Sequence, residues 1–109
     1  MRFSCDDIKL CKSGVEGFFV INEVPQNIAF HLLSYIEEIN SIFKPDELEA
    51  SVNKDSVVLL FKKPGQEDDP FKSNDAANKL GLSKILKGSD KFEFHFENGV
   101  NQLILKKMF

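Results

Sequence analysis

The dipeptide Asn98-Gly99 constrains the fold more than any other feature, because it separates two runs of alternating polar and apolar residues. Asn-Gly favours two-residue turns whose backbone twist matches that of paired strands, so it is the strongest short signal for a β-hairpin. A turn at these residues also sets the strand register. The predicted pairs are Glu97 with Val100, Phe96 with Asn101, Phe94 with Leu103, and Phe92 with Leu105.

An amphipathic helix is predicted from Gln26 to about Lys44. Apolar side chains recur there at steps of three and four residues, which is the spacing of one helix face: Ile28, Leu32, Tyr35, Ile36, Ile39 and Phe43. Pro25 suits the first turn of this helix, and Pro45 lies just beyond its end. Phe30 falls among the polar residues of the opposite face, where it is either a single exposed apolar residue or a contact site.

Two further strands are predicted over Glu49–Val52 and Ser56–Lys62. Asn53, Lys54 and Asp55 join them, and Asn and Asp tolerate the left-handed conformations of tight turns. The five consecutive apolar residues Val57–Phe61 predict a strand that is covered on both faces. We therefore expect this strand to lie at the centre of the sheet.

Another hairpin is predicted at the N-terminus. The return strand Phe18–Ile21 is strongly β-prone, and the glycines of Ser13–Gly17 suit a hairpin loop. The first strand covers Phe3–Leu10, but its apolar residues change parity half-way. We therefore expect a turn or bulge at Asp6-Asp7.

A surface loop and a short second helix are predicted between these strands and the C-terminal hairpin. Pro64–Pro70 contains two prolines, a glycine and three consecutive acidic residues, which break regular structure. The helix is expected to begin near Ser73 or Asn74. Gly81 is expected to end or kink it before a last turn over Ser83–Leu86.

The predicted element order is ββ-α-ββ-α-ββ. This order indicates an α+β fold, with an antiparallel sheet backed by one long amphipathic helix. The chain has 109 residues, 42% of them hydrophobic and 28% charged, which fits a single globular domain.

The sequence also bears on the compartment. The N-terminus becomes acidic within six residues and has no apolar segment, so no secretory signal is expected. No apolar run approaches the roughly 20 residues that a bilayer requires, and we expect no membrane interaction. Cys5 and Cys11 are too few for a disulfide scaffold. We expect two free thiols and a cytoplasmic protein of unknown oligomeric state.

Glu93, His95 and Glu97 alternate along one strand and are the candidate metal ligands of the sequence. The alternative is a solvated strand face on which Lys91 and Lys106 balance the acidic residues. We favour that alternative and expect no metal or other cofactor. A metal-binding protein or enzyme that uses these three residues remains the second functional hypothesis.

Nucleophilic catalysis would require an activated thiol. Cys11 is the better candidate, because the carboxylates of Asp6 and Asp7 raise the pKa of the neighbouring Cys5 thiol. No phosphate-binding loop is present. The sequence therefore favours a role without catalysis.

Two short patterns touch on nucleic-acid binding. Gly14–Gly17 has the G-x-x-G spacing of a phosphate-clamping loop, and residues 77–86 resemble a helix-turn-helix. We interpret the first as a hairpin loop and the second as part of the short helix. A weak nucleic-acid binder is the third hypothesis, and it would use the basic C-terminal residues Lys79, Lys84, Lys87 and Lys91.

Charge is distributed unevenly. Residues 1–75 carry 14 acidic and eight basic residues, whereas residues 76–109 carry three acidic and six basic residues. Glu67, Asp68 and Asp69 are consecutive, and Phe71 follows them closely. Exposed acidic residues can steer a basic protein, and an apolar ring can anchor it.

The first functional hypothesis is therefore a protein-binding module for a basic partner, with Glu67, Asp68, Asp69, Phe71 and Phe30 as its contact residues. By size and charge the chain resembles, as a class, the immunity proteins that bacteria pair with toxic nucleases. That resemblance involves no motif, and it implies an inhibitor or neutraliser.

Overall fold

The computed structural model describes all 109 residues, and it has an α+β fold with five strands and three α-helices. In chain order the elements are β1 (Arg2–Ser4), α1 (Ile8–Ile21), α2 (Gln26–Phe43), β2 (Glu47–Val52), β3 (Ser56–Pro64), the 3-10 helix η1 (Pro70–Lys72), α3 (Ala76–Gly88), β4 (Lys91–Glu97) and β5 (Val100–Met108). The order is thus β-α-α-β-β-α-β-β, which differs from the predicted order at the N-terminus.

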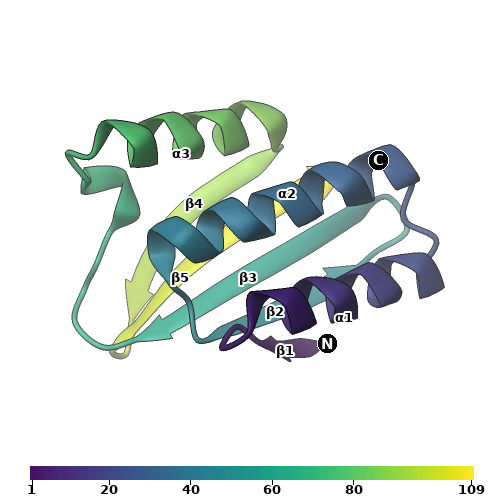
Figure 1. Ribbon diagram of the computed structural model, residues 1–109, viewed down its shortest axis with the longest axis horizontal. Coiled ribbons are helices and arrows are strands. Elements are labelled where there is room, and N and C mark those ends of the chain that lie inside the picture. Colours follow the sequence, from purple (N-terminus) through teal and green to yellow (C-terminus); the bar gives the residue numbers. More distant parts are fainter.

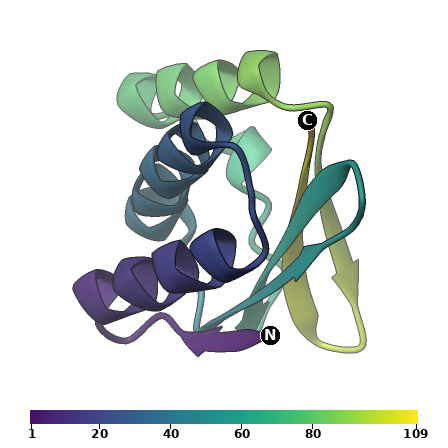
Figure 2. The same cartoon turned by 90° about the vertical axis from the view of Figure 1, so that its right-hand side faces the viewer.

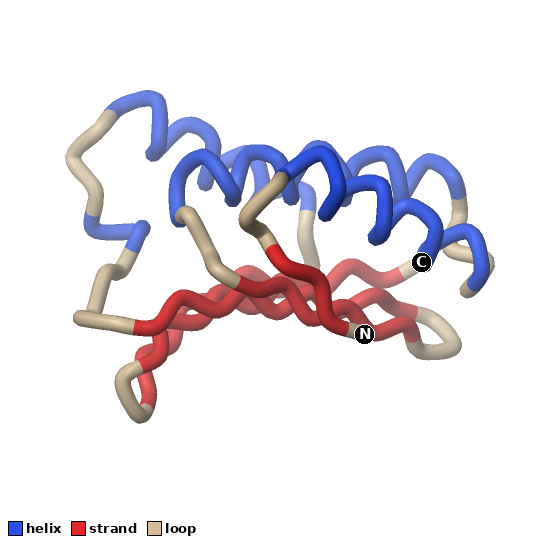
Figure 3. Tube along the Cα trace, turned by 60° about the horizontal axis from the view of Figure 1, so that its bottom comes forward, coloured by secondary structure: helices blue, strands red, loops and turns tan.

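The five strands form one antiparallel sheet in the order β1-β2-β3-β5-β4 (Figure 1). All three α-helices lie on one side of this sheet (Figure 2). The molecule therefore has a helical layer and a strand layer, and the far face of the sheet carries no helix (Figure 3). The single backing helix predicted from the sequence is replaced by three.

The C-terminal hairpin is confirmed in every predicted pair, from Glu97 with Val100 to Phe92 with Leu105. Asn98 and Gly99 have φ values of 53° and 73°, as a two-residue turn of this kind requires. The long amphipathic helix is also confirmed, since α2 begins at the predicted residue and ends at Phe43.

The predicted N-terminal hairpin is wrong, because residues 8–21 form helix α1. Cys11, Val15 and Phe19 follow one another at steps of four and are buried on one face. The carboxylate of Asp7 begins the helix by accepting hydrogen bonds from the amides of Lys9 and Leu10, at 3.0 and 3.3 Å. A glycine within a helix costs about 1 kcal/mol, whereas burying one large apolar side chain gains about 1.5–3 kcal/mol. Burial therefore outweighs the two glycines of this segment.

Strand β3 is central, as predicted, but helices cover only one of its faces. Val57, Leu59 and Phe61 are fully buried beneath the helices. Val58 and Leu60 point to the open face and are only half-buried. An antiparallel sheet can leave one face to solvent, so a continuous apolar run did not require cover on both sides.

Helix α3 begins and ends about two residues later than predicted, at Ala76 and Gly88, and is not broken at Gly81. Its N-cap is Asp75, and neither Ser73 nor Asn74 caps it; the Asp75 carboxylate accepts a hydrogen bond from the Asn78 amide at 3.0 Å. Gly81 is buried against α2, with the Glu38 and Ile42 side chains packed over it. The glycine therefore permits a close helix contact.

One hydrophobic core of 20 buried residues lies between the helical layer and the sheet. Its largest side chains are Phe19 of α1, Phe43 of α2 and Phe61 of β3. None of the helices has the length and apolar character needed to cross a membrane.

Candidate functional site

The acidic segment after β3 is attached to the sheet by the side chain of Asn101. This side chain is fully buried, with 0% exposure. Its amide nitrogen donates hydrogen bonds to the carbonyls of Lys63 at 3.1 Å and Gln66 at 2.8 Å. Its oxygen accepts one from the Asp68 amide at 2.7 Å. Three bonds from one rigid strand therefore fix the path of residues 65–69, which we call the acidic loop.

The three acidic residues of this loop have different environments. The Asp68 carboxylate forms an ion pair with Lys63 at 2.6 Å. The Asp69 carboxylate accepts a hydrogen bond from the Phe71 amide at 2.9 Å and so begins η1. Glu67 is exposed, and neither Glu67 nor Asp69 forms an ion pair. Two of the three carboxylates are therefore without a cationic partner.

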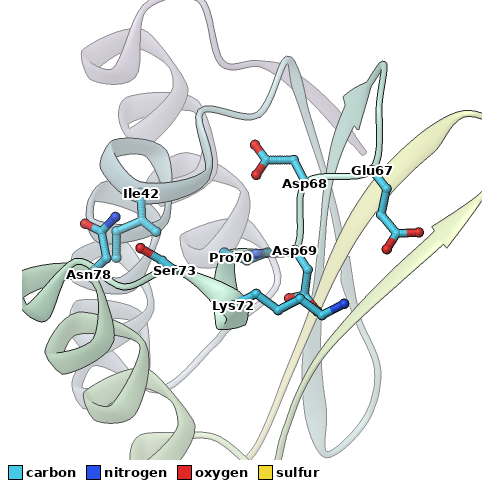
Figure 4. Close-up of a pocket in the computed structure, with 8 residues that line it drawn as sticks. All are labelled: Ile42, Glu67, Asp68, Asp69, Pro70, Lys72, Ser73 and Asn78. Atoms are coloured by element: carbon cyan, nitrogen blue, oxygen red, sulfur yellow. The ribbon is translucent and has the colours of Figure 1, made fainter.

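A cavity of about 500 Å³ lies beside the acidic loop. Its wall is polar apart from Ile42 and Pro70, and Ser73 and Asn78 line the side opposite the loop (Figure 4). Figure 4 shows the carboxylates of Glu67 and Asp68 extending to opposite sides of the chain. Lys72 also lines the cavity and is its one cationic residue.

The two candidate aromatic anchors lie in different places. Phe71 follows the acidic loop, and its ring packs edge-on against Phe92 with 5.3 Å between centroids, which leaves it 38% exposed. Phe30 is 73% exposed and lines a second cavity between α1 and α2, together with Val20 and Leu33. Ile42 follows Phe30 by twelve positions in α2, which corresponds to about 18 Å along the helix axis. The structure thus joins Phe71, but not Phe30, to the acidic loop.

The candidate metal ligands on β4 do not form a cluster. Nε2 of His95 lies 3.1 Å from a Glu93 carboxylate oxygen, and Lys91 forms an ion pair with the same oxygen at 3.7 Å. Glu97 takes part in neither contact, and nowhere in the chain do three or more His, Cys, Asp or Glu side chains gather as metal ligands would. These contacts are those of a solvated, charge-balanced strand face.

The two thiols are free and buried. A hydrogen bond with Cys11 and burial both raise the pKa of the Cys5 thiol, and the nearby carboxylates of Asp46 and Asp6 raise it further. The same hydrogen bond lowers the pKa of Cys11, but that side chain is only 3% exposed. Both sulfur atoms therefore lie in largely buried side chains rather than at an exposed site.

Both patterns that suggested nucleic-acid binding are part of regular helices. Gly14–Gly17 lies inside α1, so the segment is neither a hairpin loop nor a phosphate clamp. Residues 77–86 lie inside the continuous helix α3, so no helix-turn-helix exists. Lys79, Lys84 and Lys87 are exposed on α3, while Lys91 lies on β4 and pairs with Glu93.

A network of charges occupies the open face of the sheet beside β1. Lys62 forms ion pairs with Glu49 at 2.9 Å and with Glu47 at 4.0 Å, and Arg2 reaches Glu49 at 3.0 Å. The hydrogen bond from Lys62, together with its charge and that of Arg2, lowers the pKa of Glu49 against a smaller opposing effect of burial.

Asn101 is the residue that sequence reasoning missed. The predicted register already placed it opposite Phe96, on the same face as Leu103 and Leu105. A polar side chain on a core-facing position must find hydrogen-bond partners, and that was the available signal. The sequence alone did not indicate that the partners lie in the acidic loop.

No family model matches this chain, and no curated protein matches its sequence. A functional conclusion therefore depends on the geometry described above.

Proposed function

We propose that this protein is a binding module that captures a basic segment of another protein at the acidic loop. The observation that carries the proposal is the attachment of that loop by Asn101, beside a cavity of about 500 Å³. A loop that is already ordered loses little conformational entropy when a partner binds. The carboxylates are thus held in place before the partner arrives.

The charges favour an arginine or lysine side chain as the group that enters the cavity. Glu67 and Asp69 lack ion pairs within the chain, so each can accept hydrogen bonds from a cation of the partner. Ile42 supplies an apolar surface for the aliphatic stem of such a side chain. Phe71, exposed by 38% next to the loop, is the adjoining apolar contact.

Lys72 opposes this binding, because it places a like charge at the same cavity. Replacing it should therefore strengthen the complex, in contrast to replacement of the acidic residues. We propose that complex formation neutralises a basic functional surface of the partner, as the class resemblance to immunity proteins implies. Two buried free thiols suit a reducing compartment, and we propose that the interaction takes place in the cytoplasm.

The proposal is tested by capture of the partner from the native source on the immobilised protein. A single basic protein should be retained, and its retention should weaken with rising salt because exposed charges are screened. Reversal of all three loop charges (Glu67→Lys, Asp68→Lys and Asp69→Lys) should reduce capture at least about tenfold, which corresponds to ~1.4 kcal/mol. Lys72→Glu should increase capture.

A matched control reverses three exposed acidic residues away from the loop: Glu16, Glu23 and Asp55. Its net charge equals that of the loop variant, so it separates a local contact from a general effect of charge. Capture by the control should resemble that of the natural protein. Undiminished capture by the loop variant would refute the proposed binding site.

A further inference from the structure

Strand β4 forms a free edge of the sheet. It pairs with β5 on one side and has no strand on the other (Figure 1). The opposite edge, β1, has only three residues, whereas β4 has seven and keeps a continuous register from Lys91 to Glu97. A long edge without proline or bulge presents unpaired backbone groups to which another strand can bind.

The outward backbone groups of β4 belong to its phenylalanines. Glu97 and Val100 close the two-residue turn as a hydrogen-bonded pair, and such pairs alternate along an antiparallel ladder. The backbone groups of Glu93, His95 and Glu97 are therefore used by β5. Those of Phe92, Phe94 and Phe96 point to the free edge.

We propose that two copies of this chain associate through antiparallel pairing of their β4 strands, about a two-fold axis at Phe94. The sequence Lys-Phe-Glu-Phe-His-Phe-Glu is complementary to itself in this register. Each facing pair consists of one residue from either copy: Lys91 with Glu97, Glu93 with His95, Phe92 with Phe96, and Phe94 with Phe94. Opposite charges and aromatic rings that face each other across two strands stabilise their pairing.

Other registers lack this complementarity. A shift of two residues in one direction places Glu93 opposite Glu93 of the second copy, and in the other direction it places Glu93 opposite Glu97. Like charges in directly opposite positions destabilise a strand pair. A shift of one residue places phenylalanines opposite charged residues and mixes the two faces. The two-fold register at Phe94 is the one that aligns all seven residues favourably.

The covered face of the sheet provides independent support. A shallow depression runs along the edge of β4, and it is lined by Phe71, Leu86, Phe92 and Phe94 among others. Phe96 is 39% exposed and Leu86 is 52% exposed, so apolar side chains along this edge remain in contact with solvent. Two-fold pairing brings Phe96 of each copy beside Phe92 of the other. Apolar surface at this edge would thereby be covered.

The resulting assembly has one continuous sheet through both copies and an isologous interface, in which the same strand serves both partners. The acidic loop contributes no facing pair to it. Asp69 and Phe71 line the depression beside β4 as well, so the two proposed surfaces adjoin each other. The variants at positions 93 and 95 leave the acidic loop and Phe71 unchanged, so failure of the dimer can be distinguished from failure of the proposed binding.

Two single variants and their mixture test this interface. His95→Glu places a carboxylate opposite Glu93 of the second copy, and Glu93→Lys places an ammonium group opposite His95, each twice because of the two-fold symmetry. The mass in solution is measured by sedimentation equilibrium or light scattering over a series of protein concentrations. Circular dichroism checks that both variants fold, which is expected because positions 93 and 95 are exposed.

We expect the natural protein to form a dimer of twice its 12.4 kDa mass. Each variant alone should dimerise at least about tenfold more weakly. The equimolar mixture should recover the dimer, because its facing pairs are again complementary. One pair is the natural Glu93 with His95, and the other joins the introduced carboxylate of one copy to the introduced ammonium group of its partner.

Each variant also loses the contact between Glu93 and His95 within its own chain. Recovery of the dimer in the mixture would show that loss of this contact is not what weakens dimerisation. A monomer at every concentration, or a dimer that neither variant weakens, would overturn the inference.

Discussion

The side-chain oxygen of Asn101 accepts a hydrogen bond from the backbone amide of Asp68 at 2.7 Å, across 33 residues of sequence. The same side chain donates to two carbonyls, one at the end of β3 and one within the loop that contains Asp68. A buried residue of strand β5 thus determines the position of an exposed acidic segment. The Asn101 side chain therefore contributes both to the stability of the fold and to the proposed binding function.

Replacing Asn101 by leucine should therefore affect both the fold and the loop. The change removes the side-chain partner of two carbonyls and one amide, and we expect the free energy of unfolding to fall by about 2–4 kcal/mol. Amide hydrogen exchange of residues 65–69 should accelerate more than that of the sheet. Urea denaturation and exchange measurements check both effects.

Gln102→Ala is the control for this change. Gln102 is the next residue of β5, points to the open face and makes no side-chain hydrogen bond within the chain. Its replacement should alter stability by less than about 0.5 kcal/mol. Equal losses of unfolding free energy for Asn101→Leu and Gln102→Ala would show that the hydrogen bonds from Asn101 to the acidic loop contribute little to stability.

The contact between α2 and α3 depends on two glycines that lie seven residues apart on α3. A Cβ on Gly88 would overlap the Tyr35 hydroxyl, and one on Gly81 would overlap the Glu38 carboxylate. Gly88→Ala should lower the free energy of unfolding by about 1–3 kcal/mol, because an aromatic ring must move. Gly81→Ala should cost less, since the flexible Glu38 side chain can turn aside.

Gly17→Ala in α1 is the matched control for these two changes. No atom lies within 4 Å of the Cβ it would add, so the gain in helix propensity should stabilise the protein by about 0.5–1 kcal/mol. Thermal unfolding of the three variants gives the comparison. A stabilising effect of Gly88→Ala would contradict the packing described here.

The local signals that predicted the C-terminal hairpin and α2 succeeded because each was complete within its own segment. Asn98-Gly99 specified a turn, and the apolar spacing of α2 specified one helix face. Residues 8–21 were mistaken for strands because the β-prone run Phe18–Ile21 and two glycines outweighed the four-residue spacing of the buried positions. The sheet that buries those positions is built by segments far along the chain.

The candidate site was predicted only in part. Three consecutive acidic residues identified the exposed loop, but no local pattern revealed that Asn101 holds it or that Phe71 packs on Phe92. Both contacts join segments that are adjacent only after the sheet and η1 have formed. Phe30 was grouped with the same surface because the sequence does not show which part of α2 lies beside the acidic loop.

Glu49 should make stability depend on pH in the acidic range. Lys62 lowers the pKa of its carboxyl below the ordinary value of 4.5. The ion pair therefore contributes fully above that value and is lost as the pH falls through the lower pKa of the folded state. We expect Glu49→Gln to lower the free energy of unfolding by about 0.5–1 kcal/mol at pH 7, since solvent screens the partly exposed pair. At a pH below the folded-state pKa of Glu49, the substitution should have little effect.

Urea denaturation of Glu49→Gln, Lys62→Met and the double variant over a pH series measures this contribution. The double variant should lose less free energy of unfolding than the sum of the losses of the two single variants, because each single substitution already removes the same ion pair. Strict additivity at pH 7, or a difference from the natural protein that grows as the pH falls, would be inconsistent with the assigned ion pair.

Cys5 and Cys11 should react slowly with thiol reagents in the folded protein. Both are buried, and the raised pKa of Cys5 keeps its thiol protonated. A disulfide-exchange reagent should label both cysteines rapidly in denaturant. In the folded protein, the rate of labelling should follow the rate at which the structure around the thiols opens. Rapid labelling of one cysteine in native buffer would indicate that the segment joining β1 to α1 opens locally.

The proposed binding of a basic segment at the acidic loop is tested most directly by amide chemical shifts during titration with a peptide of alternating arginine and glycine. We predict that the largest shifts fall on residues 67–69 and 71–73, Ile42 and Asn78, and that they disappear when Glu67, Asp68 and Asp69 are reversed to lysine. Shifts spread evenly over the other exposed acidic residues, or centred on the groove beside Phe30, would contradict the assignment of the acidic loop as the binding site.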